Sequence, residues 1–254
     1  GIPAGKWVTD YELPLLDAGG RELSRNIKLQ VRGPEKVCII GKNGTGKTTI
    51  LKIINGMLAA DAGNIRLGMN VDIGYYDQEH HVLHAEKTLF EEISDDYPFL
   101  NNTQIRNTLA AFLFTGDDVF KKIESLSGGE QGRVSLAKLM LSESNFLILD
   151  EPTNHLDIMS KEILEGAINA YAGTVLYVSH DRYFINKTAT RILDLRDKTL
   201  TEYLGNYEYY IEKRTEQLNR SSAATDLGRD PAASAVNESA NKMDWKSQKE
   251  AQAA

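Results

Sequence analysis

The feature that most constrains the fold is the segment G41-K-N-G-T-G-K-T48, which fits the pattern G-x-x-x-x-G-K-[ST]. A continuous apolar run at residues 37–40 precedes this segment and indicates a strand that is buried on both faces. Apolar residues at helical spacing follow it from Ile50 to Leu58. The segment therefore predicts a strand, a phosphate-binding loop and a helix in direct succession.

The residue types in this loop suit the binding of a nucleotide. Glycines let backbone N–H groups turn toward an anion, and the N-terminus of the next helix adds its positive end. Lys47 is expected to reach the β- and γ-phosphates, and the Thr48 hydroxyl can ligate Mg²⁺. The expected nucleotide-binding residues are Gly41, Lys42, Asn43, Gly44, Thr45, Gly46, Lys47, Thr48 and Thr49. The alternative is a chance glycine-rich turn, which the flanking strand and helix argue against.

Further apolar runs predict an α/β fold with a mostly parallel sheet. Residues 146–149 and 174–178 indicate two more buried strands, and an amphipathic helix is expected between them at 161–170. The order strand, helix, strand is typical of a crossover between parallel strands.

Two other regions depart from this pattern. Residues from about 79 to 141 look mostly helical, which predicts an α-helical subdomain inserted into the core. The first 35 residues carry turn signals at 17–20 and the alternating Ile27, Leu29 and Val31, which favour an N-terminal antiparallel β subdomain.

Two acids follow the run at 146–149. A phosphate loop needs a carboxylate that orients a metal ion at the tip of a neighbouring strand, and Asp150 stands at that position. Glu151 is adjacent and could deprotonate the water that attacks the phosphate. The alternative is that both acids only solvate a strand end.

The segment L126-S-G-G-E-Q131, 24 positions (150 − 126) before Asp150, resembles the signature motif of ATP-binding-cassette (ABC) proteins. "YYDQEH", "LILDEPTNHLD" and "VSHD" complete the ABC set in the order that the family has them. The resemblance implies a P-loop NTPase of the ABC type that binds ATP with Mg²⁺ and hydrolyses it.

The resemblance also assigns roles beyond the phosphate loop. It implies that Gln78 contacts Mg²⁺ or water, and that His180 contacts the γ-phosphate. The implied catalytic residues are Glu151, His180 and Gln78, and the implied metal ligands are Thr48, Gln78 and Asp150. The signature adds nucleotide contacts from Ser127, Gly128, Gly129 and Glu130. In this family Ser127 and Gly129 would bind the γ-phosphate of a nucleotide held by an opposite cassette, so two cassettes would close head to tail.

Longer stretches resemble the ABC-F branch, whose members are soluble proteins with two tandem cassettes. The stretches are "EPTNHLD", "VSHDRYF", "IRNTLAAFLFTGDDVFKKIESLSGGE" and "YLGNYEYYIEKR". Only 48 positions (126 − 78) separate Gln78 from Leu126, which is too few for an inserted arm and predicts the second, C-terminal cassette. The partners implied are a second cassette, tandem or in a homodimer, and the ribosome. The alternatives are a nucleotide-binding subunit of a membrane transporter, and a degenerate cassette that binds ATP without hydrolysing it.

One position departs from the family pattern. Many ABC cassettes stack adenine on an aromatic residue upstream of the phosphate loop, and the spacing places that position near Leu15 or Leu16. Neither residue is aromatic, although Tyr11 is close by. The expected contact with the adenine ring therefore has no assigned residue.

Composition limits the location and the partners. The 254 residues carry a formal charge of −7, and no apolar run is long enough to span a membrane. The single cysteine, Cys38, lies in an apolar run, which suits a reducing compartment such as the cytoplasm. We expect a cassette at 1–211 and a polar linker or truncated extension at 212–254. Because charges balance in that segment, no polybasic tail is predicted. DNA is not an expected partner of this acidic chain, and direct insertion into a membrane is not expected.

Overall fold

The computed structural model describes residues 15–16, 22–24, 29–31, 33–60, 65–77, 83–142, 144–154 and 156–225. The chain divides into two compact units, the first ending at Tyr210 and the second beginning at Ile211. The helix α7 (Tyr207–Thr225) contains this boundary. The division expected at residues 211 and 212 stays a prediction, because residues 226–254 lie outside the described part of the chain.

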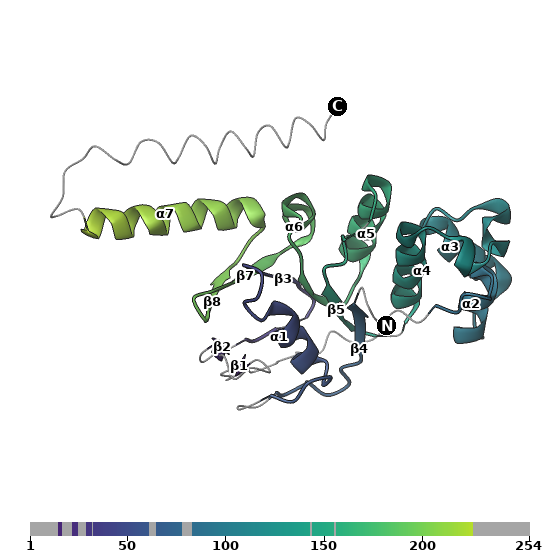
Figure 1. Cartoon of the computed structure of the whole chain (residues 1–254), viewed down its shortest axis with the longest axis horizontal. Helices are drawn as coiled ribbons and strands as arrows, with labels where there is room; N and C mark the ends of the chain where they lie inside the picture. Colours follow the sequence, from purple (N-terminus) through teal and green to yellow (C-terminus); the bar gives the residue numbers. More distant parts are fainter. Residues whose placement is uncertain are drawn as a thin grey trace. The chain divides into compact units, whose positions relative to one another are not determined.

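A six-stranded sheet forms the centre of the first unit, in the order β4-β5-β6-β3-β7-β8 (Figure 1). Its strands are β3 (Lys36–Gly41), β4 (Ile73–Asp77), β5 (Phe146–Asp150), β6 (Thr174–Val178), β7 (Arg191–Arg196) and β8 (Thr199–Tyr203). All neighbouring pairs are parallel except β7 and β8, which are antiparallel. The predicted α/β class with a mostly parallel sheet is confirmed. Continuous apolar runs predicted β3, β5 and β6, whereas β4, β7 and β8 were not predicted.

Successive residues of β3 face two different hydrophobic cores. Val37 and Ile39 pack in a core with α1 (Lys47–Ile54), whereas Cys38 packs in a core with α5 (Ile158–Ala170) and α6 (Arg182–Thr188). Side chains alternate between the faces of a strand, so a strand covered on both faces needs apolar residues at every position. This arrangement explains the continuous apolar runs. The helix after the loop is shorter than predicted, because α1 ends at Ile54 and Leu58 is 46% exposed.

The helical region is confirmed over its described residues, 83–141. It contains α2 (Leu89–Asp96), α3 (Asn102–Ala111), the short 3₁₀ helices η1 (Gly116–Phe120) and η2 (Ile123–Ser125), and α4 (Gly128–Leu141). In Figure 1, α2, α3 and α4 gather beside the β4 edge of the sheet. Near the N-terminus, β1 (Leu15–Leu16) and β2 (Glu22–Ser24) form an antiparallel pair, on either side in the sequence of the turn signals at 17–20. The alternation did not mark these strands, because residues 29–31 belong to no strand.

Candidate active site

The loop between β3 and α1 begins in the middle of the sheet, where β3 lies between two parallel neighbours, β6 and β7. Gly41 ends β3 so close to β7 that a Cβ atom there would lie 2.6 Å from the carbonyl oxygen of Leu195. Gly46, which precedes α1, has a φ of 95°, in the left-handed region that favours glycine. The glycines of the motif are therefore required by the backbone path of the loop.

Lys47 begins α1 and folds back over the loop. Its Nζ donates to the carbonyl oxygens of Gly41 at 2.9 Å and of Lys42 at 3.0 Å. Burial lowers the pKa of Lys47, while the charges of Glu151 and Asp150 oppose that shift. The N-cap residue, Gly46, makes no side-chain cap hydrogen bond. A buried cation thus stands beside a helix N-terminus that no side chain caps, an arrangement suited to an anion.

The two carboxylates follow from the end of β5. Asp150 is its last residue and is 8% exposed, and Glu151 comes next with a φ of 47°. Such a φ is strained for a residue with a side chain. Burial raises the pKa of Glu151 above its usual value, and His180 opposes this rise. The Glu151 side chain is therefore a stronger base than an exposed carboxylate.

Glu151 and His180 meet across neighbouring strands. Because β5 and β6 are parallel, their carboxyl ends lie at the same edge of the sheet, with Asp150 opposite Val178. His180 Nε2 lies 3.2 Å from Glu151 Oε1, and the backbone N–H of His180 donates to Glu151 Oε2 at 3.3 Å. The structure brings two of the three predicted catalytic residues into direct contact.

A cleft of about 490 Å³ lies over these groups. Its lining includes Asn43, Gly44, Gly46, Lys47, Thr48, Thr49, Glu151, Asn154, Val178 and His180. Most of the predicted phosphate-loop residues therefore share one cleft with Glu151 and His180. Asn154 and Val178 line the cleft but were not among the predicted site residues. Their sequence signal was their place in "LILDEPTNHLD" and "VSHD".

The signature residues occupy a different place. Ser127 caps the N-terminus of α4, followed by Gly128, Gly129 and Glu130. Ser127 Oγ and the Ser127 backbone N–H each donate to Glu130 Oε2 at 2.8 Å. Among the described residues that line the cleft, none belongs to this motif. The signature is therefore not part of the nucleotide cleft within one chain.

Some predicted positions lie outside the described residues. Gln78 and Tyr11 are among them, and the side chains of Leu15 and Leu16 are not described either. The expected role of Gln78 and the missing adenine contact stay predictions.

The residues present suit a magnesium ion. Thr48 lines the cleft, and Asp150 ends β5 close enough for its charge to act on Lys47. Hydroxyl and carboxylate oxygens are the donors that Mg²⁺ prefers. The donor set therefore fits this ion.

Comparison with known proteins agrees with this geometry. The family described as "ABC transporter" matches residues 24–154, which is more than half of the chain. The chain belongs to the ABC transporter family. It is an ABC-type ATPase domain, and its relatives place it among the ABC-F proteins.

Three relatives illustrate the match. YdiF of Bacillus subtilis is 56% identical over 184 residues, which are 72% of this chain and 29% of YdiF. ABC transporter F family member 5 of Arabidopsis thaliana is 42% identical over 204 residues, 78% of this chain and 30% of that protein. The energy-dependent translational throttle protein EttA of Escherichia coli is 40% identical over 226 residues, 85% of this chain and 41% of EttA. The ABC-F cassette thus spans only about a third of the relatives it matches.

In the ranges that the structure describes, none of the helices of this cassette is both long enough and apolar enough to cross a membrane.

Proposed function

We propose that this ABC-F cassette binds Mg-ATP in the cleft and hydrolyses it to ADP and phosphate in a head-to-tail pair with a second cassette. The observation that carries the proposal is the meeting of Lys47, Glu151 and His180 around one cleft at the carboxyl edge of the sheet. A buried cation, a carboxylate of raised pKa and an imidazole that share a cleft with a phosphate loop suit the cleavage of a phosphoanhydride.

The chain's residues would divide the reaction between them. Lys47 would exchange its bonds to the loop carbonyls for the β- and γ-phosphate oxygens, while the N-terminus of α1 holds the same charge. Glu151 would accept a proton from the water whose oxygen attacks the γ-phosphorus. The bond from that phosphorus to the β-phosphate oxygen breaks, and ADP leaves with the electron pair. His180 would hold the γ-phosphate and the Glu151 carboxylate in line.

A magnesium ion would be held by Thr48, Asp150 and Gln78. When bound, it would neutralise charge on the phosphate oxygens. The support is the oxygen chemistry of Thr48, which lines the cleft, and of Asp150, whose charge acts on Lys47.

The signature supports the pairing part of the proposal. Ser127, Gly128, Gly129 and Glu130 form the N-terminus of a 14-residue helix, α4, outside the cleft of their own chain. A helix N-terminus is suited to phosphate, so a second cassette that presents it would complete the site and exclude water.

The parent protein is proposed to act in translation, on the ribosome in the cytoplasm. The support is similarity to EttA, whose name describes a translational throttle protein, and to F family proteins. The short spacing between Gln78 and Leu126 supports the second of two tandem cassettes. Because the chain is acidic overall, we expect the main contacts with RNA phosphates to come from other parts of the parent.

Substitution of Glu151 by Gln tests the catalytic proposal. Glu151→Gln should keep ATP binding, reduce turnover by about 100-fold or more because the general base is lost, and accumulate the ATP-bound pair. Glu165→Gln is the control, because burial also raises the pKa of Glu165 but this residue lies on α5, outside the cleft lining. Phosphate release and sedimentation measure the two effects, and undiminished turnover of Glu151→Gln would contradict the role of Glu151.

The proposed action on the ribosome is tested with the full-length parent protein. A parent that carries Glu151→Gln should co-sediment with ribosomes in ATP. Co-purification with membrane-domain subunits would instead support a transporter subunit and overturn the ribosomal proposal.

A further inference from the structure

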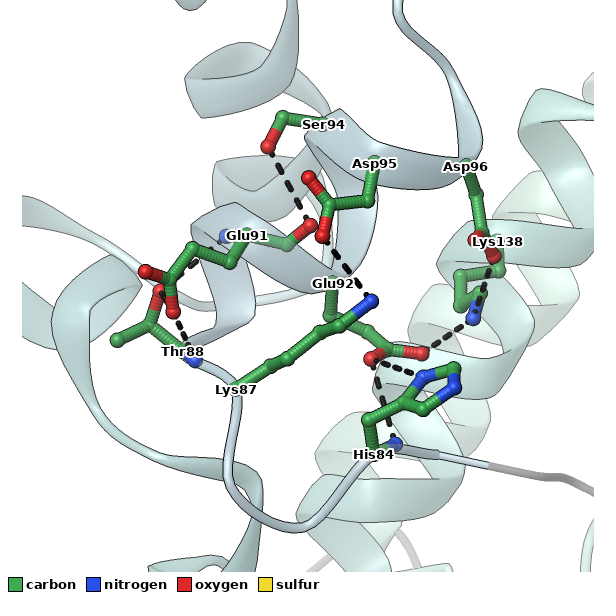
Figure 2. Close-up of polar contacts among 9 residues, drawn as sticks. All are labelled: His84, Lys87, Thr88, Glu91, Glu92, Ser94, Asp95, Asp96 and Lys138. Carbon is green, nitrogen blue, oxygen red and sulfur yellow. Dashed lines mark hydrogen bonds and ion pairs between the residues drawn. The ribbon is translucent and has the colours of Figure 1, made fainter.

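Glu92, on α2, is a fully buried carboxylate outside the nucleotide cleft. Its Oε1 forms an ion pair with Nζ of Lys138 on α4. Its Oε2 accepts from the backbone N–H of His84 at 3.3 Å and lies 3.0 Å from His84 Nδ1 (Figure 2). One side chain therefore connects three segments of the helical region: α2, α4 and the chain that leads into α2.

Lys138 strengthens the connection between α2 and α4. Its Nζ also lies 2.7 Å from Oδ2 of Asp96, one helical turn after Glu92. Burial lowers the pKa of Lys138, but the hydrogen bonds to Asp96 and Glu92 outweigh it and raise the pKa. The backbone oxygen of Lys138 accepts from the Tyr97 hydroxyl at 2.6 Å. Lys138 thus fixes α4 against successive residues at the end of α2.

Backbone hydrogen bonds tie the same segment to the chain just before the signature. The N–H groups of Ile123 and Glu124 donate to the carbonyl oxygens of Lys87 and Ala85, each at 3.0 Å. The residues before α2 are therefore bonded to the residues that lead into Ser127. These two backbone hydrogen bonds hold the chain that leads into Ser127. The contacts of Glu92 and Lys138, called the Glu92 clamp below, hold the helix α4 that follows Ser127.

The clamp acts on Ser127 through the length of α4. Lys138 lies 11 residues (138 − 127) beyond Ser127, which is about 16 Å along a helix. A shift of α4 at Lys138 would therefore displace its N-terminus. Buried ion pairs are often no more stabilising than apolar pairs of similar size, and in some proteins they specify one arrangement because each charge must meet its partner. The burial of Glu92 is therefore better explained by a need to fix α2 against α4 in one position than by a gain in the free energy of folding.

We propose that Glu92 is a positioning residue for the closed cassette pair: by clamping α2, α4 and His84 together, it sets the position from which Ser127 reaches the nucleotide of the opposite cassette. This inference rests on the proposed function of the signature. Glu92 is expected to affect pairing and turnover while leaving nucleotide binding in the chain's own cleft unchanged, because it makes no contact with that cleft.

The test uses this chain with Glu151→Gln, which is expected to pair in ATP. Adding Glu92→Gln should weaken ATP-dependent pairing about tenfold, within the range usual for coupling between sites. Binding of a fluorescent ATP analogue by the single chain, measured at concentrations too low for pairing, should stay unchanged. Sedimentation at a temperature well below unfolding separates the pairing effect from a loss of stability.

Asp95→Asn is the matched control. It removes a carboxylate from the same helix, but Asp95 is 57% exposed and pairs with Lys87 at 3.0 Å rather than with α4. In the Glu151→Gln background, Asp95→Asn should pair as strongly as the chain that carries Glu151→Gln alone. Should Glu92→Gln fail to fold, Glu92→Asp replaces it, because Asp keeps the charge but shortens the reach to Lys138.

Each outcome decides the matter. Weakened pairing of the Glu92 variant with normal nucleotide binding supports the inference. Normal pairing, even with a lowered unfolding temperature, or weakened pairing of Asp95→Asn to the same degree, overturns it. Failure of the Glu151→Gln chain to pair at all overturns head-to-tail pairing between two copies of this chain, and the inference with it.

Discussion

Two helix N-termini take part in the proposed reaction, and only one of them has a side-chain cap. At α1 the N-cap residue is Gly46, which offers no side chain, and the first turn contains no acid. At α4 the N-cap residue is Ser127, whose side chain accepts from the Glu130 N–H while Glu130 reaches back to the Ser127 N–H. Only α1 leaves its positive end open to an external anion, whereas α4 already holds a carboxylate of its own.

The difference matches the two tasks. The start of α1 is held by the sheet and must accept phosphate from solution, so an uncapped end favours binding by a single chain. The start of α4 must remain folded while no partner is present, and its capping box supplies that stability. Nucleotide on a partner would then share Ser127 with Glu130.

The largest effect is expected from giving α1 a side chain at its cap. Gly46→Ser should destabilise the fold by about 1–2 kcal/mol, because its φ of 95° is strained for any other residue, and should abolish ATP binding by reshaping the loop. Gly56→Ser is the matched control: its φ is 73°, at the other end of the same helix and outside the cleft lining. Both variants should lose similar stability in chemical denaturation. Normal ATP binding by Gly46→Ser would remove the distinction between the two helix ends.

A smaller effect is expected from removing the cap of α4. Ser127→Ala should cost about 1 kcal/mol of stability, the usual loss for an N-cap serine. It should not change ATP binding by the single chain, but it should weaken pairing in the Glu151→Gln background. Asn101→Ala removes the equivalent capping box of α3 and should lose similar stability with normal pairing. Equal pairing of the two variants would argue that Ser127 only caps its helix.

The smallest effect concerns the pH dependence of stability. Hydrogen bonds from the Ser127 backbone and side chain lower the pKa of Glu130 in the folded state. A lowered carboxyl pKa stabilises the fold above the unfolded pKa, and this contribution is lost as the pH falls through the folded pKa. Glu130→Gln should therefore reduce the free energy of unfolding at pH 7, and its difference from the parent should shrink below about pH 4. A difference that is constant with pH would contradict the capping role of the charge.

Much of the fold followed from local patterns, and the exceptions have physical reasons. The strands β5 and β6 are fully buried, so each shows a continuous apolar run. β4 was missed because it contains Gly74, where an added Cβ would lie 2.9 Å from a side-chain carbon of Leu147. Neighbouring packing, rather than local preference, selects that residue. β7 begins and ends with arginine, and its pairing with β3 is distant in sequence.

The candidate site was predictable where a motif fixed it and not where packing did. The phosphate loop, Glu151 and His180 each follow a recognisable strand, and the structure brings them together at one cleft. The strained backbone of Glu151 had no sequence signal. Glu92 resembles any solvated acid on a helix until Lys138, 46 positions away, is placed against it.

The backbone of Glu151 has a consequence for selection. Its left-handed φ and its partly buried carboxylate both act against the folded state, so glycine at this position would relax the chain while removing the proposed base. Thermal stability therefore favours glycine at position 151, whereas phosphate cleavage requires glutamate there. A cassette that is selected only for its folded structure can replace Glu151, whereas a cassette that is selected for ATP hydrolysis must retain it.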